Sequence, residues 1–154
     1  DEDRRASLET LRGRVAIANA KLAYQHYQAL SAGDRWQALA AKGARPQRLL
    51  WASTGVKNPT YRDVLYIEEL IGPDTVNTMP VPTFEAFRDH GVVAATLTLG
   101  VDDARQVMAA LETVGISMLD VTDRLQTDAV RLFVVPFDKL LGAIETRCAA
   151  IPRV

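Results

Sequence analysis

Cysteine, histidine and long apolar runs are all scarce in this sequence of 154 residues. The single cysteine, Cys148, cannot form an internal disulfide, so we expect a reducing, cytoplasmic setting. Together with two distant histidines, His26 and His90, it offers too few clustered ligands for a metal site, and no cofactor is expected. Charged residues interrupt every apolar run within a few positions, which excludes a membrane span. No signal peptide is evident at the DEDRR start.

The charge balance gives no indication of a nucleic-acid partner. The formal net charge is −1, whereas a nucleic-acid-binding domain needs a basic face. The chain is nevertheless long enough to bury the core of one compact domain, and 48% of its residues are apolar.

The first third of the chain is predicted to be helical. Apolar residues recur at helical spacing over residues 3–30, and Gly13 within that run indicates tight packing or a bend. Asp34 is expected to cap a short helix over residues 35–42, which Gly43 ends with a left-handed turn.

Residues 48–90 show the alternation of strand and helix that is typical of a parallel α/β unit. The continuous apolar run LLWAS predicts a strand covered on both faces, because an exposed face would alternate with polar residues. The expected elements are a strand at 49–53, a helix at 61–71 capped by Thr60, a strand at 75–82, and a helix at 84–90 capped by Thr83.

The remainder is predicted to be a series of helices. One runs from Val101 to about Val114, a short one covers 118–125, and Thr127 and Asp128 are expected to cap the last. Pro136 predicts a kink or break in that helix. Its apolar stripe, which we expect to lie in the core, comprises Phe133, Phe137, Leu140, Leu141, Ile144 and Cys148.

The loop after the first strand is the strongest candidate for a binding site. Ser53, Thr54, Lys57 and Asn58 bring hydroxyl, ammonium and amide groups to the carboxyl end of a strand, where parallel α/β folds bind ligands. Backbone N–H groups of a glycine-containing loop and a lysine favour an anion. The alternative is a solvated turn with a surface lysine.

Thr78 is a second candidate, on the second strand. Alternation along a strand turns Thr78 away from Asn77 and Met79, so one of these two sets faces the interior of a barrel. The alternative is a strand that tolerates one polar residue. We expect Lys21 to be an ordinary lysine on a helix surface, and His26 and His90 to be surface or capping residues.

Three segments resemble a known family: RVAIANAKLAYQHYQ at 14–28 with KGARPQRLLWASTGVKNPTYRD at 42–63, DTVNTMP at 74–80 with TFEAFRDHG after it, and GISMLDVTDRLQTDAVRLFVVPFDKLL at 115–141. They are similar to the C-terminal portion of the longer, bacterial type of transaldolase, which also occurs fused to phosphoglucose isomerase. The three segments occur in the same order as in that family, and together they run over nearly the whole chain.

This resemblance implies a fold and an activity. Transaldolases are (β/α)₈ barrels of the pentose phosphate pathway that transfer a dihydroxyacetone unit between sugar phosphates through a lysine Schiff base. The substrates implied are fructose 6-phosphate, sedoheptulose 7-phosphate, erythrose 4-phosphate and glyceraldehyde 3-phosphate. Ser53 would face the substrate, and Lys57 matches a basic residue near the sugar phosphate.

Such a barrel takes roughly 250 residues, so the resemblance implies that this chain carries only the last two strands and a helix-rich tail. Residues 1–44 would be helices, 45–91 two strand–helix units and 92–154 the C-terminal helices of one barrel domain. The Schiff-base lysine and acid–base carboxylates would lie outside the chain, and the missing N-terminal portion of the barrel would be its partner. The alternative is a non-catalytic, helix-rich binding or assembly module derived from the barrel.

Overall fold

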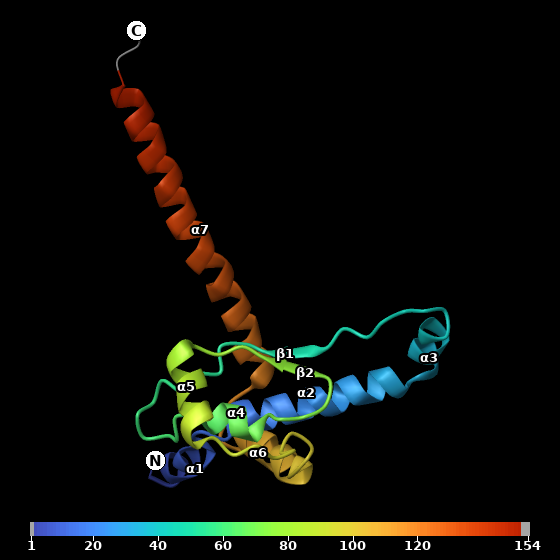
Figure 1. Ribbon diagram of the computed structural model, residues 1–154. Coiled ribbons are helices and arrows are strands. Elements are labelled where there is room, and N and C mark those ends of the chain that lie inside the picture. Colours follow the sequence, from blue (N-terminus) through green and yellow to red (C-terminus); the bar gives the residue numbers. More distant parts are fainter. Residues whose placement is uncertain (1, 152–154) are drawn as a thin grey trace. The chain divides into compact units, whose positions relative to one another are not determined.

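The computed structural model describes residues 2–151, and these contain seven helices and two strands (Figure 1). The chain divides into two compact units, Asp1–Ala110 and Leu111–Val154, with the boundary inside α6. The elements are α1 (Glu2–Leu11), α2 (Val15–Ala32), α3 (Asp34–Ala40), β1 (Leu49–Trp51), α4 (Leu65–Glu69), β2 (Thr75–Asn77), α5 (Val81–His90), α6 (Val101–Thr113) and α7 (Met118–Ala150).

A turn at Gly13 divides the predicted helix at 3–30 into α1 and α2. Gly13 has φ of 74°, a left-handed conformation that glycine adopts without a steric penalty. A Cβ atom there would lie 3.3 Å from the ring of Tyr61, so close packing also favours glycine. The prediction of a bend at Gly13 is confirmed, and that of one continuous helix is wrong.

The two strands form a parallel pair, as predicted. Leu49 pairs with Thr75, and Trp51 pairs with Asn77, so the two strands end level with each other. Helices α2 and α4 lie on one side of this pair (Figure 1). A buried cluster of Tyr24, Leu70 and Leu97 packs there, with Leu49 and Trp51 of β1 against it.

The opposite face of β1 is not covered. Leu50 points away from the cluster, and 52% of its surface is exposed. The expectation that both faces of this strand are buried is therefore wrong for the described residues. The apolar run predicted that both faces of this strand would be covered. Among the described residues, only one face is.

Three predicted helix caps are wrong because each helix begins at a different residue. Helix α3 begins at Asp34 after Gly33, so Asp34 is its first residue rather than its cap. Helix α4 begins at Leu65, and Thr60 instead donates its N–H and hydroxyl to Asn58 Oδ1. Helix α5 begins after Pro80, two residues before Thr83, and takes a proline in its first turn, where the missing N–H costs nothing.

Lys21 is not a surface residue. Its side chain is 10% exposed, and its ammonium donates to Glu69 Oε2 at 3.0 Å and to the carbonyl of Leu99 at 3.2 Å. The ion pair of Lys21 and Glu69 ties α2 to α4 inside the first unit. The prediction of an ordinary surface lysine is wrong.

The second unit is dominated by α7, a single helix of 33 residues. Ser117 caps it, since its Oγ accepts the N–H of Asp120 at 3.2 Å. Thr127 lies inside this helix and donates to the carbonyl of Asp123, so the predicted separate helix at 118–125 and the cap at Thr127 and Asp128 are wrong. Pro136 removes one backbone hydrogen bond without ending the helix.

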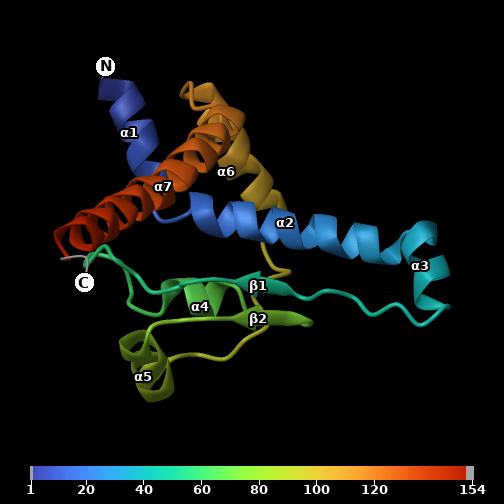
Figure 2. The same cartoon turned by 90° about the horizontal axis from the view of Figure 1, so that it is seen from above.

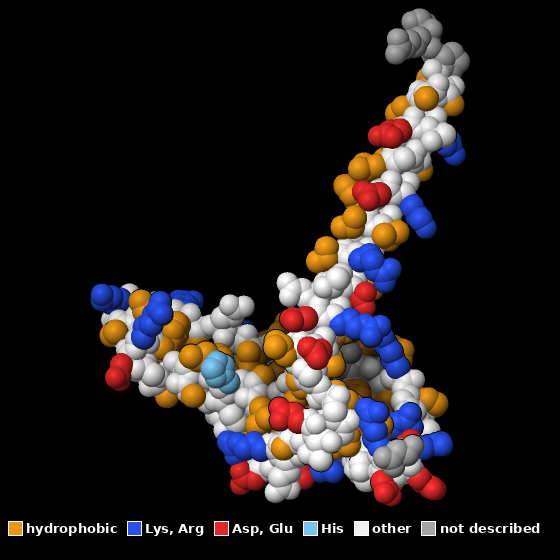
Figure 3. Space-filling model, turned by 180° about the vertical axis from the view of Figure 1, so that it is seen from behind, with side chains coloured by type: hydrophobic (Ala, Val, Ile, Leu, Met, Phe, Trp, Pro, Cys, Tyr) orange, Lys and Arg blue, Asp and Glu red, His pale blue; other side chains and the backbone are white. Residues whose placement is uncertain are grey.

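The apolar stripe of α7 is exposed rather than buried, and apolar side chains are visible along this helix in Figure 3. Phe133 is 81% exposed, and Cys148, predicted to lie in the core, is exposed as well. No helix in the described part of the chain is both long and apolar enough to cross a membrane.

Candidate functional site

The carboxyl ends of the two parallel strands bring the loops after β1 and β2 together (Figure 2). Pairing continues past both strands, because the N–H of Thr78 donates to the carbonyl of Trp51 at 2.9 Å. The N–H of Thr54 then donates to the carbonyl of Thr78 at 3.2 Å. Ser53, Thr54 and Thr78, predicted as site residues from separate segments, are therefore neighbours.

Thr54 lies at the centre of this junction and is buried, with 7% of its surface exposed. Its hydroxyl donates to Asn77 Oδ1 at 2.6 Å and lies 3.3 Å from the carbonyl of Thr78. The hydroxyl proton is thus committed to holding the two strand ends together. Asn77 was not among the predicted site residues, although its amide oxygen fixes this junction.

Ser53 is exposed beside this junction. Its φ of 57° is uncommon for a residue with a side chain and costs on the order of 1–3 kcal/mol, which the surrounding structure must offset. The backbone N–H donates to Thr78 Oγ1 at 3.3 Å, so the two loops hold this conformation jointly. The hydroxyl of Ser53 has no hydrogen-bond partner among residues 2–151, which leaves it available to a ligand.

Lys57 and Asn58 lie further along the same loop and are exposed. The Lys57 ammonium has no partner among the described residues, whereas Asn58 Oδ1 accepts from Thr60 and closes a turn. Within its described range the structure shows no hydrogen bond from either side chain to Ser53, Thr54 or Thr78. It brings together three of the five predicted site residues and places the other two on the loop that extends from them.

Ionic contacts hold the far end of this loop. Arg62 donates from Nε and Nη2 to the two carboxylate oxygens of Glu68, at 2.7 and 2.8 Å, and from Nη2 to the carbonyl of His90 at 3.0 Å. The N–H of Val92 donates to Glu68 at 2.9 Å. The hydrogen bonds from Arg62 lower the pKa of Glu68. Neither Arg62 nor Glu68 was predicted, because nothing in the local sequence indicates their pairing.

His90 extends this network at the end of α5. Its Nε2 lies 2.9 Å from Asp63 Oδ1, and its Nδ1 lies 3.1 Å from Asp89 Oδ2. The hydrogen bonds to Asp63 and then Asp89 raise the pKa of His90, and the bond to His90 lowers the pKa of Asp63. The ring thus links the end of the loop to the end of α5, and it lies at the surface.

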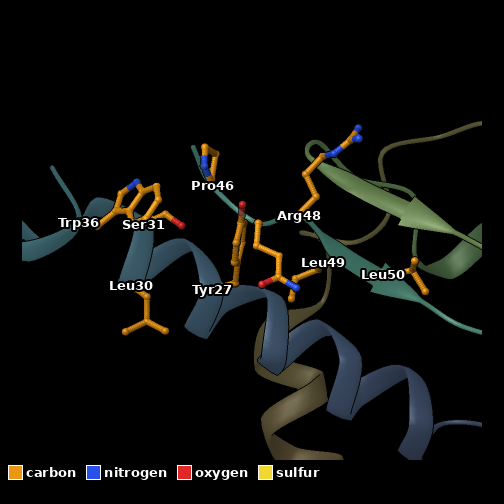
Figure 4. A pocket seen from close by; sticks show the side chains of 9 residues that line it. Tyr27, Leu30, Ser31, Trp36, Pro46, Arg48, Leu49 and Leu50 are labelled. Atoms are coloured by element: carbon orange, nitrogen blue, oxygen red, sulfur yellow. The ribbon is translucent and has the colours of Figure 1, made fainter. Parts of the chain in front are cut away.

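One of the larger cavities lies away from this junction. An opening of about 510 Å³ lies where α2 and α3 meet the segment before β1, next to the amino end of that strand (Figure 4). Tyr27, Trp36 and Pro46 line it, and the side chain of Arg48 points away from them. A smaller cavity of about 250 Å³ adjoins Ser53 and Thr54 between β1 and helices α2 and α4. Both are mainly apolar, so neither replaces the strand-end loops as an anion site.

None of the four lysines lies on a strand. Lys21 and Lys139 are in helices, Lys42 is in a turn, and Lys57 is in the loop after β1. Among the described residues there is also no group of three or more side chains that could hold a metal ion. The site as it stands therefore offers hydroxyl, amide and ammonium groups that can bind a ligand.

The fold and the site define a class: a helix-rich α/β protein whose polar loops follow two aligned parallel strands. The chain belongs to the Transaldolase/Fructose-6-phosphate aldolase family, whose profile matches residues 2–144. Curated relatives include a transaldolase of Trichodesmium erythraeum, 46% identical over 149 residues, and a transaldolase of Frankia alni, 52% identical over 137 residues.

These alignments cover most of this chain but a minor part of each relative. The Trichodesmium protein is matched over 96% of this chain and 39% of its own length, and the Frankia protein over 88% and 37%. "Transaldolase 2" of a Nostoc species, 49% identical over 142 residues, is covered to 37%. The chain thus spans about two fifths of the relatives it matches and corresponds to their C-terminal part.

Proposed function

We propose that this chain forms the C-terminal part of a (β/α)₈ transaldolase barrel and supplies its last two strands as β1 and β2. The parallel pair with helices on one face supports this assignment, and so does family membership. In this proposal residues 1–44, 45–91 and 92–154 are successive parts of one barrel domain. The uncovered face of β1 at Leu50 is then the face that the rest of the barrel covers.

The proposed activity is transfer of a dihydroxyacetone unit between sugar phosphates through a lysine Schiff base, in the cytoplasm and within the pentose phosphate pathway. One observation carries it: polar groups from two loops converge at the aligned carboxyl ends of two parallel strands. Ligands of barrel enzymes bind at that end. Ser53 would contact the substrate, Lys57 and Asn58 would lie near its phosphate, and Thr54 and Thr78 would shape the junction.

The Schiff-base lysine is proposed to lie outside this chain. A reactive lysine needs a lowered pKa, which comes from desolvation without a compensating anion or from a cationic neighbour. Lys21 is buried, and its ammonium is already engaged by the carboxylate of Glu69 and the carbonyl of Leu99. Lys57 is exposed to water.

The proposed partner is the upstream portion of the barrel. Within the described residues β1 and β2 pair only with each other, so each leaves one backbone edge without a neighbouring strand. Such edges pair readily with further strands, and barrel closure removes them. The substrates proposed are those implied above, fructose 6-phosphate among them.

The test compares this chain alone with the complete gene product that contains the sequence. Each is assayed for transfer from fructose 6-phosphate to erythrose 4-phosphate and treated with borohydride to trap a Schiff base. We expect turnover and a trapped adduct only in the complete protein, with the adduct outside residues 1–154. An adduct on Lys57 or Lys21 would overturn the assignment of the nucleophile. A complete protein without turnover or adduct would favour the non-catalytic module.

A further inference from the structure

The loop between β1 and α4 is attached to the second strand–helix unit at both of its ends. We propose that Arg62 and Glu68 form a clamp that positions this loop, and with it Lys57, for the phosphate of a sugar phosphate. The inference rests on the proposed function and deepens it, because it assigns positioning residues to the anion-binding part of that site.

The first attachment lies at the start of the loop. The hydroxyl of Thr54 holds Asn77, as described above, and Gly55 packs directly on the beginning of α5. A Cβ on Gly55 would lie 3.0 Å from Pro80 Cγ and 3.1 Å from Thr83 Oγ1, so a side chain there would require these neighbours to shift. The start of the loop is therefore held against β2 and the beginning of α5.

The second attachment is the clamp itself, at the other end of α5. The guanidinium of Arg62 makes three hydrogen bonds, two to Glu68 at the end of α4 and one to the carbonyl of His90. Glu68 also accepts the N–H of Val92. Glu68 is 18% exposed at its side chain, whereas Arg88 and Glu85, an ion pair within α5, are 71% and 46% exposed. The clamp thus joins three segments, and the pair within α5 joins only one turn of a helix.

Between the two attachments, the loop presents a cation with no protein partner. Lys57 is exposed, and its ammonium has no hydrogen-bond or ion-pair partner within residues 2–151. An ammonium on a flexible stem is a point charge, so its location depends on the backbone that carries it. Fixing both ends of the loop lowers the conformational entropy lost when an anion binds, which improves affinity without a new contact.

The test uses the complete gene product and two variants, Arg62→Ala and Glu68→Gln, with Arg88→Ala as the matched control that removes an exposed arginine pair. We expect Arg62→Ala to raise KM for fructose 6-phosphate about three- to tenfold, as loss of charge-assisted hydrogen bonds that support binding would. The value of kcat should stay within about twofold of the parent. Glu68→Gln retains an acceptor for Val92 and should give a smaller effect in the same direction.

A phosphate-free donor separates positioning from general loss of structure. For fructose, kcat/KM should be the same in the parent and in Arg62→Ala, while inhibition by inorganic phosphate should weaken in proportion to the rise in KM. Equal losses on both donors, or an unchanged KM for fructose 6-phosphate, would overturn the clamp. If the parent itself has no turnover, the proposed function fails. In that case the affinity for inorganic phosphate is measured by phosphorus NMR titration of the parent and of Arg62→Ala. Equal affinities in the two proteins would contradict the clamp.

Discussion

Ser53 combines an exposed, unpartnered hydroxyl with a left-handed backbone conformation held by Thr78. If this hydroxyl contacts the substrate, Ser53→Ala in the complete protein removes one hydrogen bond. Turnover on fructose 6-phosphate, measured as kcat/KM, should then fall about two- to tenfold. The melting temperature should change little, because the backbone bond to Thr78 is retained. Turnover at the parental level would show that Ser53 does not line the site.

Thr54 gives a prediction about stability. Thr54→Val keeps the shape of this buried side chain but leaves the amide oxygen of the half-buried Asn77 without the 2.6 Å bond. The free energy of unfolding should fall by about 1–2 kcal/mol, the cost of an unsatisfied polar group. Thr54→Ser retains the hydroxyl and is the matched control. The free energies of unfolding of the parent and the two variants are measured by urea unfolding. If Thr54→Val loses no more stability than Thr54→Ser, the prediction is contradicted.

Lys21 and Glu69 should respond unequally to substitution, because Lys21 is the more buried partner. Glu69→Ala leaves a buried ammonium with only the Leu99 carbonyl, and we expect a loss of about 1–3 kcal/mol. Lys21→Met removes the charge and keeps most of the volume, while Glu69 can turn to water. Its unfolding free energy should therefore fall less. Urea titration of both variants measures the two losses of unfolding free energy. A larger loss for Lys21→Met than for Glu69→Ala would contradict the prediction.

The buried ion pair of Lys21 could not be predicted from the residues around it in the sequence. Its partner Glu69 lies 48 positions away, and the helical pattern around Lys21 is equally compatible with a solvated face. The proximity of Ser53, Thr54 and Thr78 follows from the parallel pairing, because strand ends in a parallel fold meet at one edge. The pairing of Arg62 and Glu68 could not be predicted, since it depends on how α4 and the end of α5 approach each other.

At the scale of elements, the network at the end of α5 predicts a pH dependence. The folded-state pKa of His90 is raised by Asp63 first and Asp89 second, against the opposing effects of desolvation and of Arg62. Its contribution to stability is therefore complete below the unfolded-state pKa of about 6.5 and is lost as pH rises through the higher folded-state value. His90→Gln should lower the melting temperature at pH 5.5 and have less effect at pH 8.5.

His26→Gln, on the exposed face of α2, is the matched control for this histidine. A His90→Gln effect of the same size at both pH values would show that the charged ring does not stabilise the end of α5. A decrease in melting temperature that was larger at pH 8.5 than at pH 5.5 would contradict the predicted pH dependence.

The order and type of the elements could be predicted from periodicity, since strand, helix, strand and helix follow one another over residues 49–90. Their boundaries could not, because several polar residues compete for each cap. Asn58 accepts the bonds of Thr60, and Pro80 starts α5 before Thr83 can cap it. In α7 the turn after Thr127 remained helical, since the hydroxyl bonds to the preceding turn of the same helix.

At the scale of the whole molecule, each unit carries apolar surface that the described residues leave uncovered. In the first it is the face of β1 at Leu50, and in the second it is the stripe of α7 that includes Phe133 and Phe137. Large apolar patches mark interaction sites. The chain spans about two fifths of its relatives, so we expect the remainder of a complete barrel to cover these faces.

The corresponding measurement is binding of the dye ANS. The chain produced alone should bind it strongly, and the complete gene product should bind it weakly at the same molar concentration. Replacing Phe133 and Phe137 by serine should lower dye binding of the isolated chain without changing its helix content by circular dichroism, whereas Arg131→Ser is the control on the same helix. Equal dye binding by the isolated chain and the complete protein would mean that these faces stay open, and the argument for an upstream barrel portion packing on them would fail.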